Sequence, residues 1–123
     1  MIMEKKKVLF IEDDSLIVKI YTTRLELEGI EVSSAEDGEI AMQMYRQKEP
    51  DLIVLDLMLP KVSGLEILKQ IRQENKSIPI IVYSVLSDRE KIEEMKANGA
   101  NEYFVKPDIH PRQMVERIKS YLA

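Results

Sequence analysis

Four short apolar runs constrain the fold of this chain more than any other feature. Each is rich in β-branched or aromatic residues and is bounded by polar or turn-forming residues. The runs are Val8–Ile11, Leu52–Leu55, Ile78–Tyr83 and Tyr103–Val105. Three of them are continuous, a pattern typical of strands that are covered on both faces in a parallel sheet. A weaker, alternating run at Ile30–Val32 predicts an edge strand with one face in water.

Helical patterns separate these runs. Apolar residues recur at helical spacing in five groups, which are Ile17, Ile20, Tyr21 and Leu25; Ala41, Met44 and Tyr45; Leu65, Leu68 and Ile71; Ile92 and Met95; and Met114, Val115, Ile118, Tyr121 and Leu122. Gly29 and Asn98–Gly99 mark two helix ends, and Pro111 marks a helix start. A strand followed by a helix, five times over, predicts an α/β fold built on a doubly wound, five-stranded parallel sheet.

Length and composition narrow the class of protein. A chain of 123 residues predicts one domain over residues 1–123. It has no cysteine and one histidine, His110, which excludes thiol nucleophiles, zinc–thiolate sites and sites with several histidines. The net charge of −4 argues against direct nucleic-acid binding. The apolar stretches are too short for a signal peptide or a membrane span, so we expect a cytoplasmic protein.

Polar residues follow the apolar runs at the points where chemistry collects in such sheets. Glu12, Asp13 and Asp14 follow the first run, and Asp56 follows the run at Leu52–Leu55. The carboxyl ends of parallel strands meet at one edge, so these acids are expected to converge there. Two carboxylates about 4 Å apart repel by roughly 4 kcal/mol, which favours a bound cation. An oxygen-only cluster suits Mg²⁺.

A simpler interpretation of the acidic segment after the first run stays open. Glu12, Asp13 and Asp14 could be a polar loop that caps the next helix, because carboxylates favour helix N-termini. We expect the capping role for Asp14 in particular.

Asp56 strengthens the chemical interpretation, because an acid directly after a buried strand needs a partner. Beside a metal and a lysine, an aspartate can act as a nucleophile toward phosphorus. Such a reaction also needs positive charge and donors for the phosphoryl oxygens, which Lys106 and Ser84 could supply. Each of these residue types is common after a strand. Their combination at four strand ends, with acids, a hydroxyl and a lysine, indicates phosphoryl transfer.

Four segments together resemble the receiver domain of two-component response regulators. They read VLFIEDD, PDLIVLDLMLPKVSG, IPIIVYS and GANEYFVKP, and the resemblance covers essentially the whole chain. The combination of Asp56 with Pro60 and Gly64 is highly specific. The resemblance implies a flavodoxin-like (βα)5 fold with strand order 2-1-3-4-5.

The resemblance also implies a role for each site residue. Asp56 matches the phosphoacceptor, which takes its phosphoryl group from a phosphohistidine on a histidine kinase or histidine phosphotransferase. Asp13 is expected to bind Mg²⁺ directly and Glu12 through water, while Met58 provides its backbone carbonyl. Lys106 matches the lysine that contacts the acyl phosphate, and the bond between Lys106 and the next residue, a proline, is expected to be cis.

Ser84 and Tyr103 match the hydroxyl and aromatic switch pair of the family. On phosphorylation the hydroxyl is expected to move to the phosphoryl oxygens and the ring to swing inward. The surface of the fourth helix, fifth strand and fifth helix would then control a downstream output protein or domain. The same surface would allow a homodimer that forms on phosphorylation.

The sequence departs from the usual family pattern at several positions. Ser84 stands where Thr is also common, and Glu12 replaces the frequent Asp with a longer side chain. The segment from Asp108 to Pro111 adds one residue to the commoner loop. Met58 and Leu86 flank the phosphoryl site, where residues tune the lifetime of the acyl phosphate.

Three other functions compete with this interpretation. An aspartate-nucleophile phosphatase would need a general acid two residues after Asp56, where Met58 cannot transfer a proton. A flavin carrier would need a hydroxyl-rich and glycine-rich loop where Glu12 and its neighbours stand. A receiver that works without phosphorylation is disfavoured, because the expected groups are all present. The sequence fits both a stand-alone regulator and a receiver from a longer protein.

Overall fold

Five strands alternate with five α-helices along the chain, in the order that the apolar runs predict. The computed structural model describes residues 4–123. The strands are β1 (Lys7–Ile11), β2 (Glu31–Ala35), β3 (Leu52–Leu55), β4 (Ile80–Ser84) and β5 (Glu102–Val105). The helices are α1 (Ser15–Leu27), α2 (Gly38–Gln47), α3 (Gly64–Glu74), α4 (Arg89–Ala97) and α5 (Pro111–Leu122), with a 3-10 turn, η1 (Lys106–Asp108), before α5. Within this described part, every helix is too short or too polar to cross a membrane.

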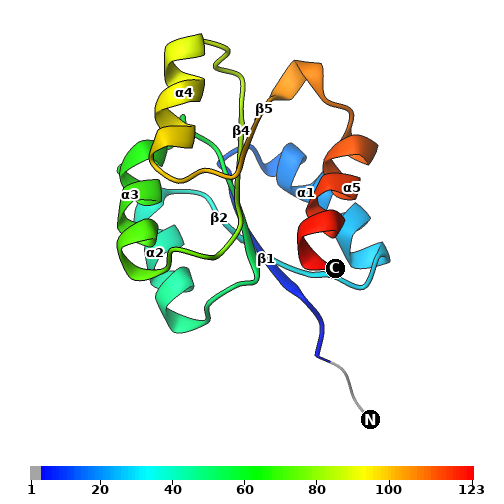
Figure 1. Ribbon diagram of the computed structural model, residues 1–123. Coiled ribbons are helices and arrows are strands. Elements are labelled where there is room, and N and C mark those ends of the chain that lie inside the picture. The colour runs from blue at the N-terminus through cyan, green and yellow to red at the C-terminus, as the bar shows by residue number, and fades with distance from the viewer. Residues whose placement is uncertain (1–3) are drawn as a thin grey trace.

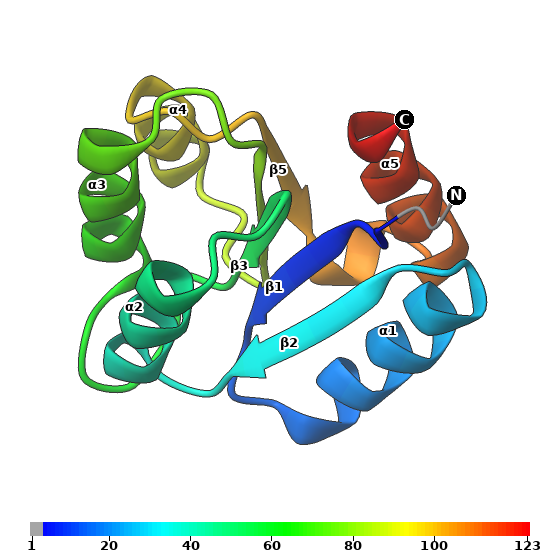
Figure 2. The ribbon, with the colours of Figure 1, turned by 90° about the horizontal axis from the view of Figure 1, so that it is seen from below.

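All five strands pair in parallel, in the order β2-β1-β3-β4-β5. The predicted doubly wound, flavodoxin-like sheet is therefore confirmed. Helices α1 and α5 cover one face, and α2, α3 and α4 cover the other (Figures 1 and 2). The strand order reverses at β1, which pairs with β2 on one side and β3 on the other, so the carboxyl ends of β1 and β3 lie side by side.

The core consists of two layers, one on each face of the sheet. The layer under α2, α3 and α4 includes Leu9, Ile11, Tyr45, Ile53, Leu55, Leu68, Ile71 and Met95. The layer under α1 and α5 includes Val8, Phe10, Tyr21, Leu25, Val54, Ile81, Met114 and Ile118. Successive strand residues point to opposite layers, and both layers are apolar. This burial on both faces explains why the runs in β1, β3 and β4 are continuous.

The edge strand β2 is longer than its sequence pattern indicates. We predicted a strand at Ile30–Val32, whereas β2 continues to Ala35 through two exposed serines. Each of its residues lies opposite one of β1, from Lys7 to Ile11. The backbone ladder alone extends the strand, because an outer edge does not require apolar side chains on its wet face.

Local capping positions the helices as the sequence predicts. The carboxylate of Asp14 accepts hydrogen bonds from the backbone N–H groups of Leu16 and Ile17, at 3.0 and 3.3 Å, so its capping role is confirmed. Gly29 follows α1 with a φ of 79°. His110 caps α5, since its Nδ1 accepts the N–H of Arg112 at 3.1 Å.

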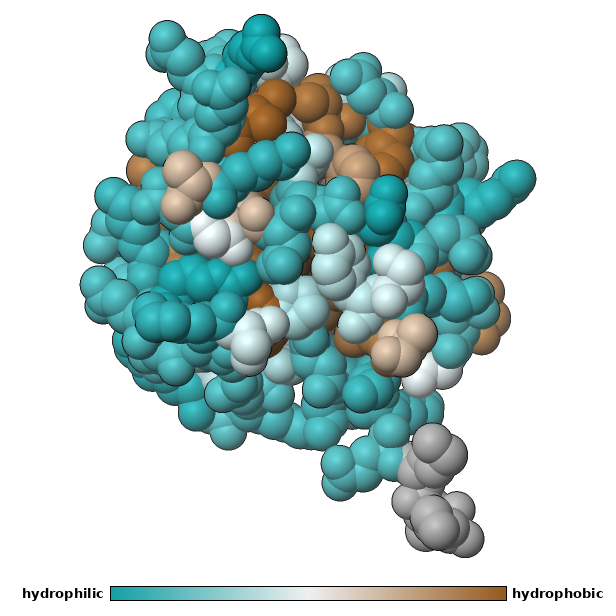
Figure 3. All heavy atoms as spheres, in the orientation of Figure 1, coloured by the Kyte–Doolittle hydropathy of each residue, from teal (hydrophilic) through white to brown (hydrophobic). Residues whose placement is uncertain are grey.

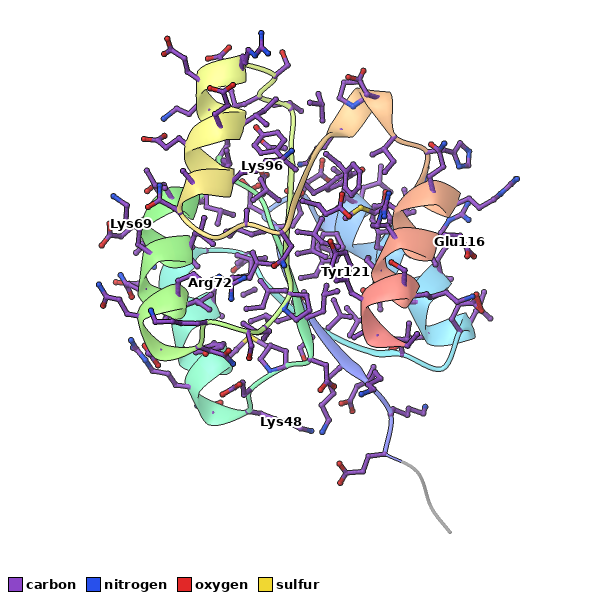
Figure 4. The ribbon with its side chains drawn as sticks, in the orientation of Figure 1. Lys48, Lys69, Arg72, Lys96, Glu116 and Tyr121 are labelled. Carbon is purple, nitrogen blue, oxygen red and sulfur yellow. The ribbon has the colours of Figure 1, made fainter. Side chains whose placement is uncertain are left out.

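A half-buried arginine fixes the end of α4 to α3. Arg72 lies between α3 and the loop before β5 (Figure 4), where its Nε and Nη2 donate to the carbonyl of Gly99 at 2.9 and 2.8 Å. The same Nη2 donates to Asn101 Oδ1 at 3.0 Å. Gly99 has a φ of 109°, and a Cβ there would lie 2.7 Å from Arg72 Nε. Both facts require glycine at this position.

The expected cis bond between Lys106 and Pro107 is wrong. All peptide bonds in residues 4–123 are trans. Lys106 to Asp108 form the turn η1, with the proline at its start. The fixed φ of proline fits such a helical turn.

Substitution of Gly64, the first residue of α3, is expected to destabilise the protein. A Cβ there would lie 2.6 Å from the Cα of Leu57 and 2.7 Å from the carbonyl oxygen of Asp56. Backbone atoms cannot move aside without shifting the loop after β3. We expect Gly64→Ala to lower the free energy of unfolding by about 1–3 kcal/mol in urea denaturation.

Gly29→Asn is the matched control for this substitution. A Cβ at Gly29 meets nothing within 4 Å, and asparagine tolerates the left-handed backbone. Because this φ still strains any side chain slightly, we expect a loss below about 1 kcal/mol, smaller than that of Gly64→Ala. If Gly64→Ala were as stable as the wild type, the close approach of α3 to the loop after β3 would be contradicted.

Candidate functional site

Polar side chains from four strand ends meet at one edge of the sheet, the upper edge in Figure 1. Glu12 directly follows β1, Asp56 follows β3, Ser84 ends β4 and Lys106 follows β5. Glu12, Asp56 and Ser84 are all buried. Apolar strands hold each of these groups at the sheet edge, so their positions are fixed by the core rather than by flexible loops.

The ammonium group of Lys106 joins two of the strand-end carboxylates. Its Nζ lies 2.6 Å from Glu12 Oε1 and 3.2 Å from Asp56 Oδ2. The side chains of Glu12 and Asp56 are 1% and 6% exposed, and that of Lys106 is 13% exposed. A buried acid without a cationic partner is costly, and Lys106 offsets part of this cost for both acids.

Three carboxylates lie close enough to share one cation. Glu12, Asp13 and Asp56 each place an oxygen within 4.8 Å of the others. Glu12 Oε1 is buried and lies 2.6 Å from the Lys106 ammonium. One ammonium cannot neutralise three acids. The oxygen-only donor set therefore fits a hard divalent ion such as Mg²⁺.

Asp14 and Met58 contact this group of acids through their backbone N–H groups. Asp14 uses its carboxylate to cap α1, although its backbone N–H donates to Glu12 Oε2 at 3.2 Å. Met58, for which we predicted a metal-binding carbonyl, donates its N–H to Asp56 Oδ1 at 3.3 Å. Its side chain is exposed. This hydrogen bond orients the Asp56 carboxylate, and the role of the Met58 carbonyl stays a prediction.

Burial and charge shift the pKa values of the paired groups. Burial raises the pKa of Glu12 from 4.5 to about 7, against the opposing effect of Lys106. Burial tends to lower the pKa of Lys106, but the carboxylates of Glu12 and Asp56 outweigh it and hold that pKa above its ordinary value. Lys106 therefore stays charged, whereas Glu12 exchanges its proton near neutral pH.

The raised pKa of Glu12 predicts a pH-dependent stability in the absence of metal. The protonated form of Glu12 favours the folded state. Its contribution to the free energy of unfolding is complete below pH 4.5 and is lost as the pH rises through about 7. From about pH 5 to about pH 8 we expect the metal-free wild type to lose about 2 kcal/mol of unfolding free energy that Glu12→Gln does not lose. Urea denaturation in a chelator measures both profiles. Parallel profiles for the two proteins would contradict the buried, proton-exchanging Glu12.

Ser84 and Tyr103 are linked through the backbone of one loop residue. The Ser84 hydroxyl accepts the N–H of Leu86 at 3.2 Å, and the Tyr103 hydroxyl donates to the carbonyl of Leu86 at 2.6 Å. Ser84 is fully buried and Tyr103 is half-buried. Burial also raises the pKa of Tyr103. A displacement of the Ser84 hydroxyl would therefore disturb the same peptide segment that holds the Tyr103 ring.

Sequence reasoning missed one group at this site. The ring of Tyr83 lies under the Lys106 ammonium, with 5.5 Å between Nζ and the ring centroid. We treated Tyr83 only as the last residue of an apolar run. Its position directly before Ser84 was the available signal, since a ring at that strand end lies next to the polar edge.

Comparisons with known proteins agree with this geometry. The model of the response regulator receiver domain family matches residues 8–119. The probable transcriptional regulator ycf27 of Porphyridium aerugineum is 40% identical over 121 residues, which are 98% of this chain and 49% of that protein. The alkaline phosphatase synthesis transcriptional regulatory protein PhoP of Bacillus subtilis is 38% identical over 118 residues, 95% of this chain and 48% of that protein.

A solved structure shows the same fold over nearly the full length of both chains. The CheY-like response regulator receiver domain protein from Methanospirillum hungatei JF-1 superposes with a TM-score of 0.91 at 27% identity, covering 97% of this chain and 94% of the other. The chain spans about half the length of the curated relatives it matches. This chain belongs to the response regulator receiver domain family of two-component systems.

Proposed function

We propose that this receiver domain, formed by residues 1–123, accepts a phosphoryl group on Asp56 from a phosphohistidine of a histidine kinase or histidine phosphotransferase. The observation that carries the proposal is the contact of the buried Asp56 carboxylate with the Lys106 ammonium at 3.2 Å. A buried carboxylate with a specific cationic partner at a strand end is typical of a reactive site.

The reaction needs one nucleophile and compensation for charge on the transferred group. A carboxylate oxygen of Asp56 attacks phosphorus, an O–P bond forms and the N–P bond of the phosphohistidine breaks. The departing imidazole keeps the electron pair of that bond and takes a proton from water. The ammonium of Lys106 donates to a phosphoryl oxygen, and the Met58 N–H holds the Asp56 carboxylate in orientation. The domain catalyses only the formation and the hydrolysis of its own acyl phosphate.

Glu12, Asp13, Asp56 and the carbonyl of Met58 are the groups that would hold Mg²⁺. When bound, the ion supplies positive charge opposite the phosphoryl oxygens. The chain's own contribution is the cluster of acids that the ends of β1 and β3 hold together. A proton on Glu12 competes with the cation, so we expect Mg²⁺ to bind more weakly below about pH 7.

The acyl phosphate would act through the loop after β4. The phosphoryl group draws the Ser84 hydroxyl away from the N–H of Leu86. Because the carbonyl of Leu86 accepts from the Tyr103 hydroxyl, the ring loses its anchor and turns inward. Each hydrogen bond is worth only about 1 kcal/mol, so a charged phosphoryl group can shift the balance between the two loop states.

The surface formed by α4, β5 and α5 is the proposed output surface. Apolar side chains are exposed between α4 and the segment from η1 to α5, within a polar surround (Figure 3). Tyr121 lies on the same side of the molecule (Figure 4), and its hydroxyl donates to Glu102 of β5 at 3.0 Å. Met95 is the one buried residue of α4, so core packing holds this helix less than it holds the other helices.

This surface would bind a downstream protein or domain, or a second copy of the chain on phosphorylation. The relatives are named as transcriptional regulators, and we infer an output of that kind for a longer protein. The receiver domain would work in the cytoplasm without itself binding nucleic acid or a membrane.

Incubation with acetyl phosphate tests the proposed function. We expect phosphate to be incorporated only with Mg²⁺ and to be released by hydroxylamine, which cleaves acyl phosphates but leaves serine and tyrosine phosphates intact. A chelator should prevent the incorporation. Failure to incorporate phosphate, or incorporation that resists hydroxylamine, would contradict the proposal.

A further inference from the structure

Three aromatic rings pack together beneath the site. The rings of Phe10 in β1 and Tyr21 in α1 stack, with centroids 5.3 Å apart. Tyr83 of β4 meets both at an interplanar angle of 81°, with centroids 5.5 Å from Tyr21 and 6.5 Å from Phe10. These edge-to-face contacts are the arrangement that aromatic rings prefer, and they restrict how the Tyr83 ring can turn.

A hydrogen bond further fixes the Tyr83 ring. The hydroxyl of Tyr21 donates to the hydroxyl of Tyr83 at 3.1 Å, and both side chains are buried. Burial raises the pKa of Tyr21 above its usual range, so its hydroxyl stays neutral and able to donate. The ring of Tyr83 is therefore held in place from α1, on the face of the sheet that α1 and α5 cover.

The Lys106 ammonium also contacts the Tyr83 ring. Its Nζ lies over the ring, 5.5 Å from the centroid. An ammonium within about 6 Å of an aromatic face is attracted by the electron density of the ring. The attraction is stronger when water is excluded, and the lysine side chain here is 13% exposed.

Lys106 needs such a third contact, because its two carboxylate partners compete for it. The contact with Glu12 is 2.6 Å and that with Asp56 is 3.2 Å, so the shorter ion pair is not with the phosphoacceptor. A lysine stem has four carbons and many rotamers. A third contact limits the positions that the ammonium can adopt between the two acids.

We propose that Tyr83 is a positioning residue, whose ring holds the Lys106 ammonium within reach of Asp56, and that packing against the rings of Phe10 and Tyr21 keeps this ring in place. The inference rests on the proposed function, because it assigns Tyr83 to phosphoryl transfer at the same site. Tyr83 acts through Lys106 and does not itself contact the phosphoryl group.

Kinetics of labelling by acetyl phosphate separate this role from simple core packing. Tyr83→Leu removes the ring and is expected to slow labelling about three- to tenfold. Tyr83→Phe keeps the ring and should stay within about twofold of the wild-type rate. In a Lys106→Met background Tyr83→Leu should have no further effect. An equal slowing by Tyr83→Leu in both backgrounds, or by Tyr83→Phe, would overturn the inference.

A double-mutant cycle on stability tests the contact without any activity. In urea denaturation, Tyr83→Leu and Lys106→Met should be non-additive by about three- to tenfold in the unfolding equilibrium constant. Tyr45→Leu is the matched control, since Tyr45 is a buried tyrosine in the core layer on the other face of the sheet. It should be additive with Lys106→Met.

The two experiments distinguish this inference from the proposed function. Additive energies for Tyr83 and Lys106, in a protein whose Asp56 is labelled normally, overturn the positioning role alone. A wild type that cannot be labelled overturns the proposed function, and with it the role of Tyr83 in the reaction.

Discussion

Replacing Asp56 with asparagine is expected to reduce labelling by acetyl phosphate to the level of an unreacted sample. Asparagine has nearly the same size, so the strand end and its packing remain. An amide has no free negative charge and is a poor nucleophile toward phosphorus. Glu12 is the other buried carboxylate beside Lys106. Burial raises its pKa to about 7, so part of it is protonated at neutral pH and cannot attack phosphorus.

Asp51→Asn is the control for this loss. Asp51 lies just before β3, at the end of the strand opposite Asp56, where its Oδ2 accepts the N–H of Lys7 at 2.8 Å. This variant should be labelled at the wild-type rate. Urea denaturation of both variants verifies that they fold. Labelling of Asp56→Asn at a rate near that of the wild type would show that another residue accepts the phosphoryl group.

Lys106→Met should cause the second-largest loss, a fall in the labelling rate of about 10²- to 10³-fold at saturating acetyl phosphate. Methionine keeps much of the side-chain length but has no charge. The lost ammonium lies 3.2 Å from Asp56 Oδ2, where charge on the phosphoryl oxygens must be balanced. A positioned donor of this kind acts mainly on the transition state, so the rate constant should fall more than donor affinity.

Lys119→Met is the matched control for Lys106→Met. Lys119 is a lysine of α5 that forms an ion pair with Glu28 at 2.8 Å and is 40% exposed. An exposed pair contributes little to stability, and we expect normal labelling. A rate for Lys106→Met within about twofold of the wild type would contradict the role of the ammonium in the transfer.

The strands and helices could be predicted because their signals are local. Burial on both faces leaves a continuous apolar run in β1, β3 and β4, and the single carboxylate of Asp14 marks the start of α1. The strand order came from the family resemblance, since periodicity does not specify which strands pair. The extent of β2 was underestimated, because its ladder with β1 depends on backbone hydrogen bonds.

The geometry of Lys106 at the site was only partly predictable. That Glu12, Asp56 and Lys106 meet follows from their places at parallel strand ends. The ring of Tyr83 beneath the ammonium was missed, because the contact depends on how far a flexible lysine reaches from β5 across β4. The cis bond before Pro107 was expected from the family resemblance alone, and no local sequence signal specified the isomer.

We predicted from the sequence that Ser84 and Tyr103 act as a pair, but not which contacts connect them. Both hydroxyls contact the backbone of Leu86, one through its N–H and the other through its carbonyl. Side-chain identities at 84 and 103 cannot reveal that both hydroxyls contact the backbone of residue 86. Only the conformation of the loop after β4 shows it.

Mapping the phosphorylated residue tests the central claim most directly. The protein is labelled with acetyl phosphate and Mg²⁺, the acyl phosphate is reduced with borohydride, and the modified peptide is sequenced by mass spectrometry. We predict modification of Asp56 alone. Modification of Glu12 or Asp13, with Asp56 unchanged, would contradict this account of the site.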